Sequence, residues 1–162
     1  MAKKEFNPAN DIQDLQFFGE SGGVNPSISD SSTYTFLSAQ TMLDTFEGNT
    51  EGCYLYSRHT TPSNIYLGEA LAAMEGTQTA NVAASGMGAI TPTILQFCKA
   101  GDHIVSSRTI YGGTYAFLKN FTPKLNIETS FVDITSLEAV EAAITPETKI
   151  IFCECVSNPL LE

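Results

Sequence analysis

The stretch VAASGMGAITPT, residues 82–93, carries a short apolar run through a glycine-containing turn into a second apolar segment. The first run stops at Ser85, and Gly86–Gly88 separate it from the second. Glycines between two apolar segments are typical of a tight connection between a strand and a helix. The pattern therefore predicts a strand over 79–84 and a helix over 88–99.

Helix and strand patterns continue on both sides of this stretch. Upstream, Thr61 is predicted to cap a helix that begins at Pro62 and ends at Gly76. Its apolar stripe at helical spacing consists of Leu67, Leu71 and Met74. Downstream, strands are predicted over three segments: 102–107, 127–133 and 148–154.

Two more helices are predicted between these strands. The first covers YGGTYAFLKNF, residues 111–121, and stops before Pro123. The second covers 136–144, with Thr135 and Glu138 as a capping box. Strands that alternate with helices imply βαβ units, and hence an α/β fold whose parallel sheet is covered by helices.

The first 60 residues have a different character. They are rich in Ser, Gly, Asn and Pro and are predicted to form an irregular arm, with one short helix ending near Gly48. Residues 61–162 are predicted to form the α/β domain. Because a parallel sheet needs cover on both faces and only SNPLLE follows the last strand, we expect these residues to be part of a longer protein.

Charge and composition exclude several classes of function. The net charge of the 162 residues is −10, and no basic stripe is present, which argues against nucleic-acid binding. No segment approaches the roughly 20 apolar residues that span a bilayer, and no targeting signal is visible. A cytoplasmic protein that binds neither nucleic acid nor membrane is expected.

The four cysteines lack the spacing of a metal site. They are Cys53, Cys98, Cys153 and Cys155. Cys153 and Cys155 alternate along a predicted strand, so they are expected to share one face. Buried free thiols are the favoured interpretation, and no metal is expected.

The glycine turn is a candidate anion site. Ligands of parallel sheets bind beyond the carboxyl ends of the strands, and a helix start directs unpaired N–H groups and a positive dipole end at them. Ser85 can add a hydroxyl donor, so the turn suits a phosphate. A turn required only by packing remains the alternative.

A phosphate at this turn allows two classes of ligand. A dinucleotide site favours G-x-G-x-x-G, but this chain has Thr91 in place of the third glycine. In favour of this class, Arg108 could contact the extra phosphate of NADP. The other class is a single phosphate on an aromatic cofactor. Tyr111 at the next strand end could stack on its ring, and Asn158 adds a polar group after the last strand.

Several segments together resemble one enzyme family. They are LYSRHTTPS, ASGMGAI, GDHIVSSRTIYGGTY, FVDITSLEAVEAAI and ECVSNPLL. In order and spacing, from about Asn25 onward, the chain resembles the Cys/Met-metabolism family of pyridoxal-phosphate (PLP) enzymes. That family includes cystathionine γ-synthase, cystathionine γ-lyase, methionine γ-lyase and O-acetylhomoserine sulfhydrylase.

The resemblance implies a fold, a cofactor and roles for individual residues. The fold would be the first part of an aspartate-aminotransferase-like large domain, and the cofactor pyridoxal 5′-phosphate. The Ser-Gly-Met segment matches the phosphate cup, formed by Ser85 and the backbone N–H groups of Gly86 and Met87. Tyr111 matches the tyrosine that stacks on the pyridine ring and assists proton transfer. Asn158 matches the asparagine that hydrogen-bonds the phenolic oxygen of the ring.

The resemblance also implies assembly into dimers or tetramers. Tyr56 and Arg58 match a segment that reaches across a dimer interface to the phosphate of the neighbouring subunit, and the arm would thus contribute to that interface. No role is assigned to the neighbouring His59, and His103 is expected to pack at its strand start.

The implied reaction is γ-elimination or γ-replacement on sulfur-containing amino acids or acylated homoserine. The family's Schiff-base lysine lies beyond residue 162, so these residues alone are expected to be inactive. In methionine γ-lyases a cysteine usually follows the Tyr-Gly pair, whereas this chain has Gly113 there. Two alternatives remain: an NADP-binding Rossmann-like domain, and a non-catalytic remnant that pairs with another polypeptide.

Overall fold

The computed structural model describes four ranges of the chain: 6–15, 20–50, 52–157 and 160–161. The chain packs as two compact units, Met1–Val82 and Ala83–Glu162. The predicted organisation into an interface arm over 1–60 and a domain over 61–162 stays a prediction. Within the described ranges, no helix has both the length and the apolar character needed to cross a membrane.

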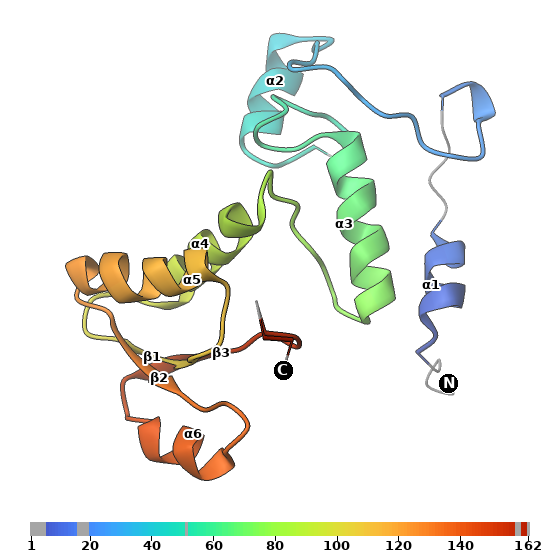
Figure 1. Ribbon diagram of the computed structural model, residues 1–162. Helices are drawn as coiled ribbons and strands as arrows, with labels where there is room; N and C mark the ends of the chain where they lie inside the picture. Colours follow the sequence, from blue (N-terminus) through green and yellow to red (C-terminus); the bar gives the residue numbers. More distant parts are fainter. Residues whose placement is uncertain (1–5, 16–19, 51, 158–159, 162) are drawn as a thin grey trace. The chain divides into compact units, whose positions relative to one another are not determined.

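The regular elements described in the first unit are helices joined by irregular segments. It contains α1 (Pro8–Asp14), the 3-10 turn η1 (Glu20–Gly22), α2 (Ala39–Phe46) and α3 (Pro62–Glu75). Helix α1 packs against α3. The short helix predicted to end near Gly48 is confirmed as α2 (Figure 1).

Helix α3 begins and ends at the predicted residues. The Thr61 hydroxyl accepts a hydrogen bond from the Asn64 N–H at 3.1 Å, and Pro62 occupies the first turn, where no N–H partner is needed. Gly76 ends the helix in the left-handed region, with φ of +67°. These caps act within four residues, which is why local sequence was enough to predict them.

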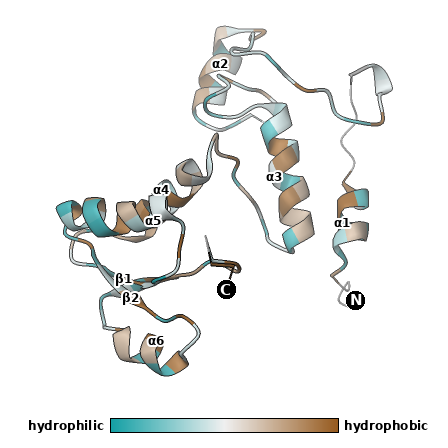
Figure 2. Cartoon of the chain, in the orientation of Figure 1, coloured by the Kyte–Doolittle hydropathy of each residue, from teal (hydrophilic) through white to brown (hydrophobic). Residues whose placement is uncertain are grey.

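The buried face of α3 is not the predicted one. Small residues are buried (Gly68, Ala70 and Ala72), whereas the predicted stripe is exposed (Leu67, Leu71 and Met74). A Cβ atom at Gly68 would lie 2.6 Å from the carbonyl oxygen of Ala80, so the returning chain crosses the helix at a glycine. Hydrophobic colour marks the middle of α3 in Figure 2.

The second unit contains the expected parallel sheet. Strands β1 (His103–Ser107), β2 (Glu128–Val132) and β3 (Thr148–Phe152) are arranged in the order β2-β1-β3, with both pairings parallel. In this unit α4 (Gly86–Phe97) and α5 (Gly112–Ala116) lie on one side of the sheet. Helix α6 (Leu137–Ala143) lies on the other side (Figure 1). The predicted α/β fold class is confirmed.

The core of this unit lies around β1. All five residues of β1 are buried. The core cluster joins residues from the helices, the strand and the connections: Ile94, Cys98, Ile104, Ile110, Leu118 and Ile127. His103 is buried at the strand start, as expected, and its ring nitrogens lie 2.8 Å from the Thr148 hydroxyl and 3.0 Å from the Ser130 hydroxyl. This histidine thus connects all three strands.

The strand predicted over 79–84 is not present. These residues are described without strand structure. A strand is defined by hydrogen bonds to a neighbouring strand, and the described residues offer this segment no ladder partner. Its apolar character was therefore insufficient to predict its conformation here.

The helix predicted over 111–121 is divided into shorter turns. Helix α5 is followed by a π-helical turn, Phe117–Phe121, and a 3-10 turn, Thr122–Leu125. Pro123 occupies the first turn of the 3-10 segment, where its missing N–H costs nothing. The chain therefore stays helical beyond the point where the proline was expected to stop it.

The predicted cap of α6 is displaced by one residue. The Ser136 hydroxyl accepts from the Ala139 N–H at 3.2 Å and donates to Glu138 at 3.0 Å. Thr135 instead donates its hydroxyl to Asp133 at 2.7 Å. Because both residues have short hydroxyl side chains, the sequence alone did not distinguish them.

The cysteines also differ from expectation. Cys98 is buried, and burial, followed by the nearby charge of Asp102, raises the pKa of its thiol. Cys153 and Cys155 are exposed, so the prediction of buried thiols is wrong for this pair. They follow β3, and strand alternation puts them on the same side as Ile151, which is also half exposed.

Candidate functional site

The start of α4 leaves backbone donors without partners. Ser85 caps the helix, and its hydroxyl oxygen accepts from the Gly88 N–H at 3.0 Å. Within the described part of the chain, the N–H groups of Gly86 and Met87 make no hydrogen bond. A Cβ atom at Gly86 would meet nothing within 4 Å, so the backbone here is open to approach.

These donors suit an anion. Helix α4 has 12 residues and no acidic residue in its first turn, so nothing on the helix offsets its positive dipole end. The hydroxyl proton of Ser85 stays available because the oxygen serves as acceptor. The donor set therefore fits a phosphate group, as a PLP site requires.

A buried contact connects the start of α4 to α5. Thr114 is fully buried, and its hydroxyl donates to the Met87 sulfur at 3.6 Å. Met87 thus contacts α5 through its side chain, while its backbone N–H stays without a partner at the start of α4 in the described residues. The contact holds the two helix starts together.

Tyr111 immediately precedes α5. Its ring is about half exposed, at 49%, and its N–H donates to a carboxylate oxygen of Glu154 at 2.9 Å. A Cβ atom at Gly113 would lie 2.5 Å from Cε1 of the tyrosine, so the ring rests against the glycine backbone. An exposed aromatic face is thus held beside the helix starts.

The arginine considered for an NADP phosphate is already paired. The Arg108 guanidinium donates to Asp133 at 2.8 Å, with the arginine side chain largely exposed and the aspartate side chain partly exposed. The pKa of Asp133 is held below its usual value, first by the hydrogen bonds from Thr135 and then by the charge of Arg108. This pairing does not favour the dinucleotide interpretation.

Tyr56 and Arg58 lie in the first unit. Tyr56 forms an isolated antiparallel bridge with Thr33, and the Arg58 guanidinium carbon lies 5.1 Å from the centroid of the Tyr56 ring. In the ranges that the structure covers, Arg58 forms no salt bridge. Its charge is therefore stacked on an aromatic face. Asn158, the remaining predicted residue, lies outside the described residues.

Two contact residues, Glu154 and Thr114, were not identified from the sequence. Both lie within segments that carry the family resemblance, YGGTY and ECVSNPLL. Their presence there was the available signal, but the contacts join residues that are distant in sequence. Gly113 was noted from the sequence only as the position of a cysteine in methionine γ-lyases, and its contact with the Tyr111 ring was not predicted.

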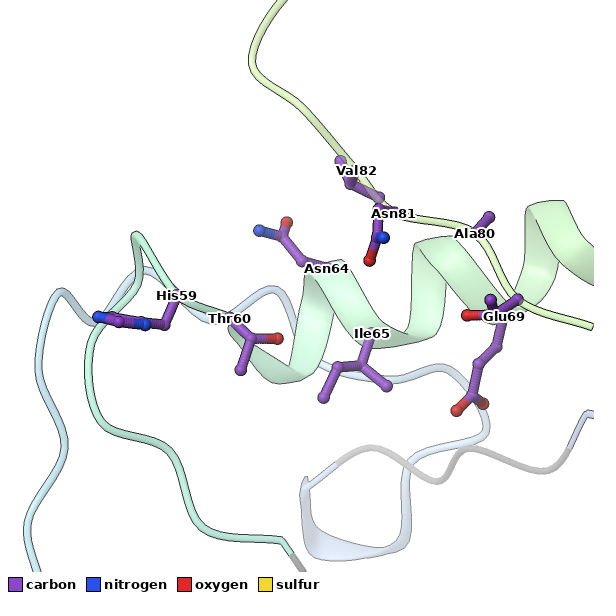
Figure 3. A pocket seen from close by; sticks show the side chains of 9 residues that line it. His59, Thr60, Asn64, Ile65, Glu69, Ala80, Asn81 and Val82 are labelled. Carbon is purple, nitrogen blue, oxygen red and sulfur yellow. The ribbon is translucent and has the colours of Figure 1, made fainter. Parts of the chain in front are cut away.

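A separate pocket lies within the first unit (Figure 3). Its volume is about 200 Å³, and its lining combines polar residues from the start of α3 and from the chain that returns along it. Among the lining residues are His59, Asn64, Glu69 and Asn81. Figure 3 shows the returning segment running along the helix at Ala80 and Val82.

Comparison with known proteins places these features in context. Residues 12–162 match the family described as Cys/Met metabolism PLP-dependent enzymes. A methionine γ-lyase of Arabidopsis thaliana is 44% identical over 99% of this chain and 38% of its own length. An O-succinylhomoserine sulfhydrylase of Pseudomonas aeruginosa is 37% identical over 81% of this chain and 32% of its own length.

Solved structures give the same result for the fold. The chain superposes with a TM-score of 0.86, at 29% identity, on a Campylobacter jejuni protein assigned as an O-acetylhomoserine (thiol)-lyase, which carries a pyridoxyl-lysine phosphate. The alignment covers 98% of this chain and 39% of that protein. The chain thus spans well under half the length of the relatives that it matches.

Proposed function

The chain belongs to the Cys/Met metabolism family of PLP-dependent enzymes, and we propose that it supplies the phosphate-binding and ring-stacking part of a PLP site. The proposed reaction of the full-length protein is γ-elimination or γ-replacement on sulfur-containing amino acids or acylated homoserine. The names of the relatives, a methionine γ-lyase and an O-succinylhomoserine sulfhydrylase, support this substrate class.

The observation that carries the proposal is the pair of free backbone donors at the start of α4. In the proposed site the N–H groups of Gly86 and Met87 and the Ser85 hydroxyl bind the cofactor phosphate. Support comes from the Ser85 cap, which leaves these two donors unused, and from the open space at Gly86. The positive end of the helix dipole adds to the attraction.

Tyr111 holds the cofactor ring in the proposed site. Support for a stacking role comes from its half-exposed ring and from its place directly before α5, whose Thr114 contacts Met87 at the start of α4. When bound, PLP supplies an electron sink for negative charge that develops at the substrate α-carbon. The Tyr111 hydroxyl serves as the acid–base group that moves a proton at the substrate, and Asn158 binds the phenolic oxygen of the ring.

The proposed assembly shares the site between subunits of a homodimer, or a tetramer of such dimers. Tyr56 and Arg58 bind the phosphate of the neighbouring subunit. Support comes from Arg58, whose guanidinium has no carboxylate partner in the described ranges, and from the exposed apolar stripe of α3. The substrate is a small amino acid, and we propose a cytoplasmic location for this metabolic enzyme.

The test of the phosphate site removes one backbone donor without changing the helix. In Gly86→Pro the full-length protein loses the N–H at the first helical position, where proline is tolerated, and Ser85 already has the extended backbone that precedes proline. Gly86→Ala keeps the N–H and is the matched control, since its Cβ meets nothing within 4 Å.

We expect Gly86→Pro to weaken PLP binding about tenfold or more, because a hydrogen bond to a charged group is lost. The control should bind PLP as the wild type does. A titration followed by cofactor absorbance measures both. Equal affinities in the two variants would contradict the phosphate role of Gly86, and a wild type that binds no PLP would favour the non-catalytic remnant.

A further inference from the structure

We propose that Glu154 is a positioning residue that sets the place of Tyr111 by accepting its backbone N–H. This inference rests on the proposed function, because it assigns a residue that acts through Tyr111 on the same site. The contact is a hydrogen bond of 2.9 Å between residues 43 positions apart in sequence.

The strand alternation accounts for the direction of Glu154. Side chains of a strand point alternately to its two faces. Ile150 and Phe152 on β3 pack against the core cluster beside α4, whereas Ile151 is half exposed. Continuing the alternation by two residues places Glu154 on the same side as α4 and α5, and Cys153 on the opposite, exposed side.

Tyr111 has no local substitute for this bond. It is the cap residue of α5, and its own side chain makes no capping hydrogen bond. In a capping box, the side chain of the third helical residue accepts the N–H of the cap residue, but in α5 that residue is Thr114, whose hydroxyl donates to Met87. The carboxylate of Glu154 supplies this acceptor instead. A hydrogen bond to a carboxylate is also shorter and stronger than one between neutral groups.

The hydrogen bond to Glu154 and the contact with Gly113 act on different parts of Tyr111. Glu154 holds the N–H of Tyr111, while the ring rests on Gly113, where a Cβ atom would lie 2.5 Å from Cε1. Two points of attachment limit both the position of the backbone and the direction of the ring. Glu154 therefore controls where the Tyr111 hydroxyl is placed without contacting the cofactor.

The experiment compares two variants of Glu154 in the full-length holoenzyme. Glu154→Met has a similar length but only a weakly accepting sulfur in place of the carboxylate, and Glu154→Gln keeps an oxygen that can accept from the Tyr111 N–H. Each change is made in the wild type and in a Tyr111→Phe background, and kcat, KM and PLP retention are measured for all of them.

We expect Glu154→Met to lower kcat about tenfold with little change in PLP retention, because misplacing a catalytic group by about 1 Å can cost up to ~100-fold in rate. Glu154→Gln should stay close to the wild type. In the Tyr111→Phe background the loss caused by Glu154→Met should almost disappear, because no hydroxyl is left to position. Equal losses in both backgrounds would overturn the proposal and indicate a general structural role.

Amide hydrogen exchange separates this inference from the proposed function. The Tyr111 amide should exchange faster in Glu154→Met than in Glu154→Gln, whether or not PLP is bound. A wild type without PLP binding but with this exchange pattern would refute the proposed function and with it the positioning role. PLP binding and turnover together with unchanged exchange in Glu154→Met would refute the positioning role alone.

Discussion

At the level of single residues, the ring of Tyr111 occupies space that only a glycine leaves free. A Cβ atom at Gly113 would lie 2.5 Å from Cε1 and 3.2 Å from Cδ1 and Cζ of the ring. Contacts this close force the ring to move, since the glycine backbone is part of α5. The resemblance places a cysteine at position 113 in methionine γ-lyases. The residue against which the Tyr111 ring lies is therefore a point where this chain differs from them.

The first prediction tests the contact between the Tyr111 ring and Gly113. Gly113→Cys should displace the ring of Tyr111 and thereby change the visible circular dichroism of bound PLP, with turnover altered by up to about tenfold. PLP retention should change little, because the donors on α4 are untouched. Gly112→Ala is the control, since its Cβ meets nothing within 4 Å. Indistinguishable spectra for the two variants would contradict the claim that Gly113 fixes the position of the Tyr111 ring.

At the level of elements, helix starts determine both the site and the boundaries of the fold. Ser85, Thr61 and Ser136 each accept a hydrogen bond from an N–H three residues ahead. At α4 this cap uses one donor and leaves the N–H groups of Gly86 and Met87 without a partner in the described residues, whereas α5 has no side-chain cap and its cap residue Tyr111 donates its N–H to Glu154. The same kind of cap thus has a structural role at α3 and α6, and we propose a second, ligand-binding role for the start of α4.

The second prediction concerns the start of α6. Ser136→Ala should lower the free energy of unfolding by about 1 kcal/mol, because the Ala139 N–H loses its acceptor. Denaturant unfolding measures the change. A loss in Thr135→Ala that exceeds the loss in Ser136→Ala would show that Thr135, as predicted from the sequence, is the true cap.

The control variant Thr135→Ala has a distinct pH signature. The hydrogen bond from the Thr135 hydroxyl, which the variant removes while the backbone N–H bond stays, lowers the folded-state pKa of Asp133, so its contribution to stability is present above the unfolded-state pKa of this carboxyl group. It is lost as the pH falls through the lowered folded-state value. The stability difference between wild type and Thr135→Ala should therefore shrink in acid.

At the level of the whole molecule, the predicted phosphate ligands are divided between the two compact units. Arg58 belongs to the unit Met1–Val82, and Gly86 belongs to the unit Ala83–Glu162. The proposed dimer brings Arg58 of one subunit to the Gly86 turn of the other. Closed two-fold symmetry then produces two equal sites, each of which needs residues from both subunits.

The third prediction tests this sharing by mixing two variants of the full-length protein that bind PLP weakly, at a PLP concentration that fills only intact sites. Arg58→Ala and Gly86→Pro should each weaken PLP binding at every site of their own dimers. In a hybrid dimer one site combines the intact Gly86 turn with the intact Arg58, while the other carries both changes. A statistical mixture should therefore recover about a quarter of the wild-type sites.

Recovered activity after mixing, measured against the two unmixed variants, would support the shared site. No recovery, with hybrid dimers detected by native mass spectrometry, would show that each site is completed within one subunit. Lys149→Ala is a suitable neutral partner in the control mixture, because the Lys149 side chain is exposed on β3 and is not among the proposed phosphate ligands.

Local sequence was enough to predict three parallel strands, the caps of α3 and a helix start at the glycine turn of residues 86–88. Each of these depends on hydrogen bonds or apolar spacing within a few residues. Tertiary structure decided which face of α3 is buried, whether residues 79–84 find a strand partner, and how Glu154 reaches Tyr111. These depend on the order β2-β1-β3 and on contacts across tens of residues, and the free energy of such contacts depends on the partner as much as on the residue itself.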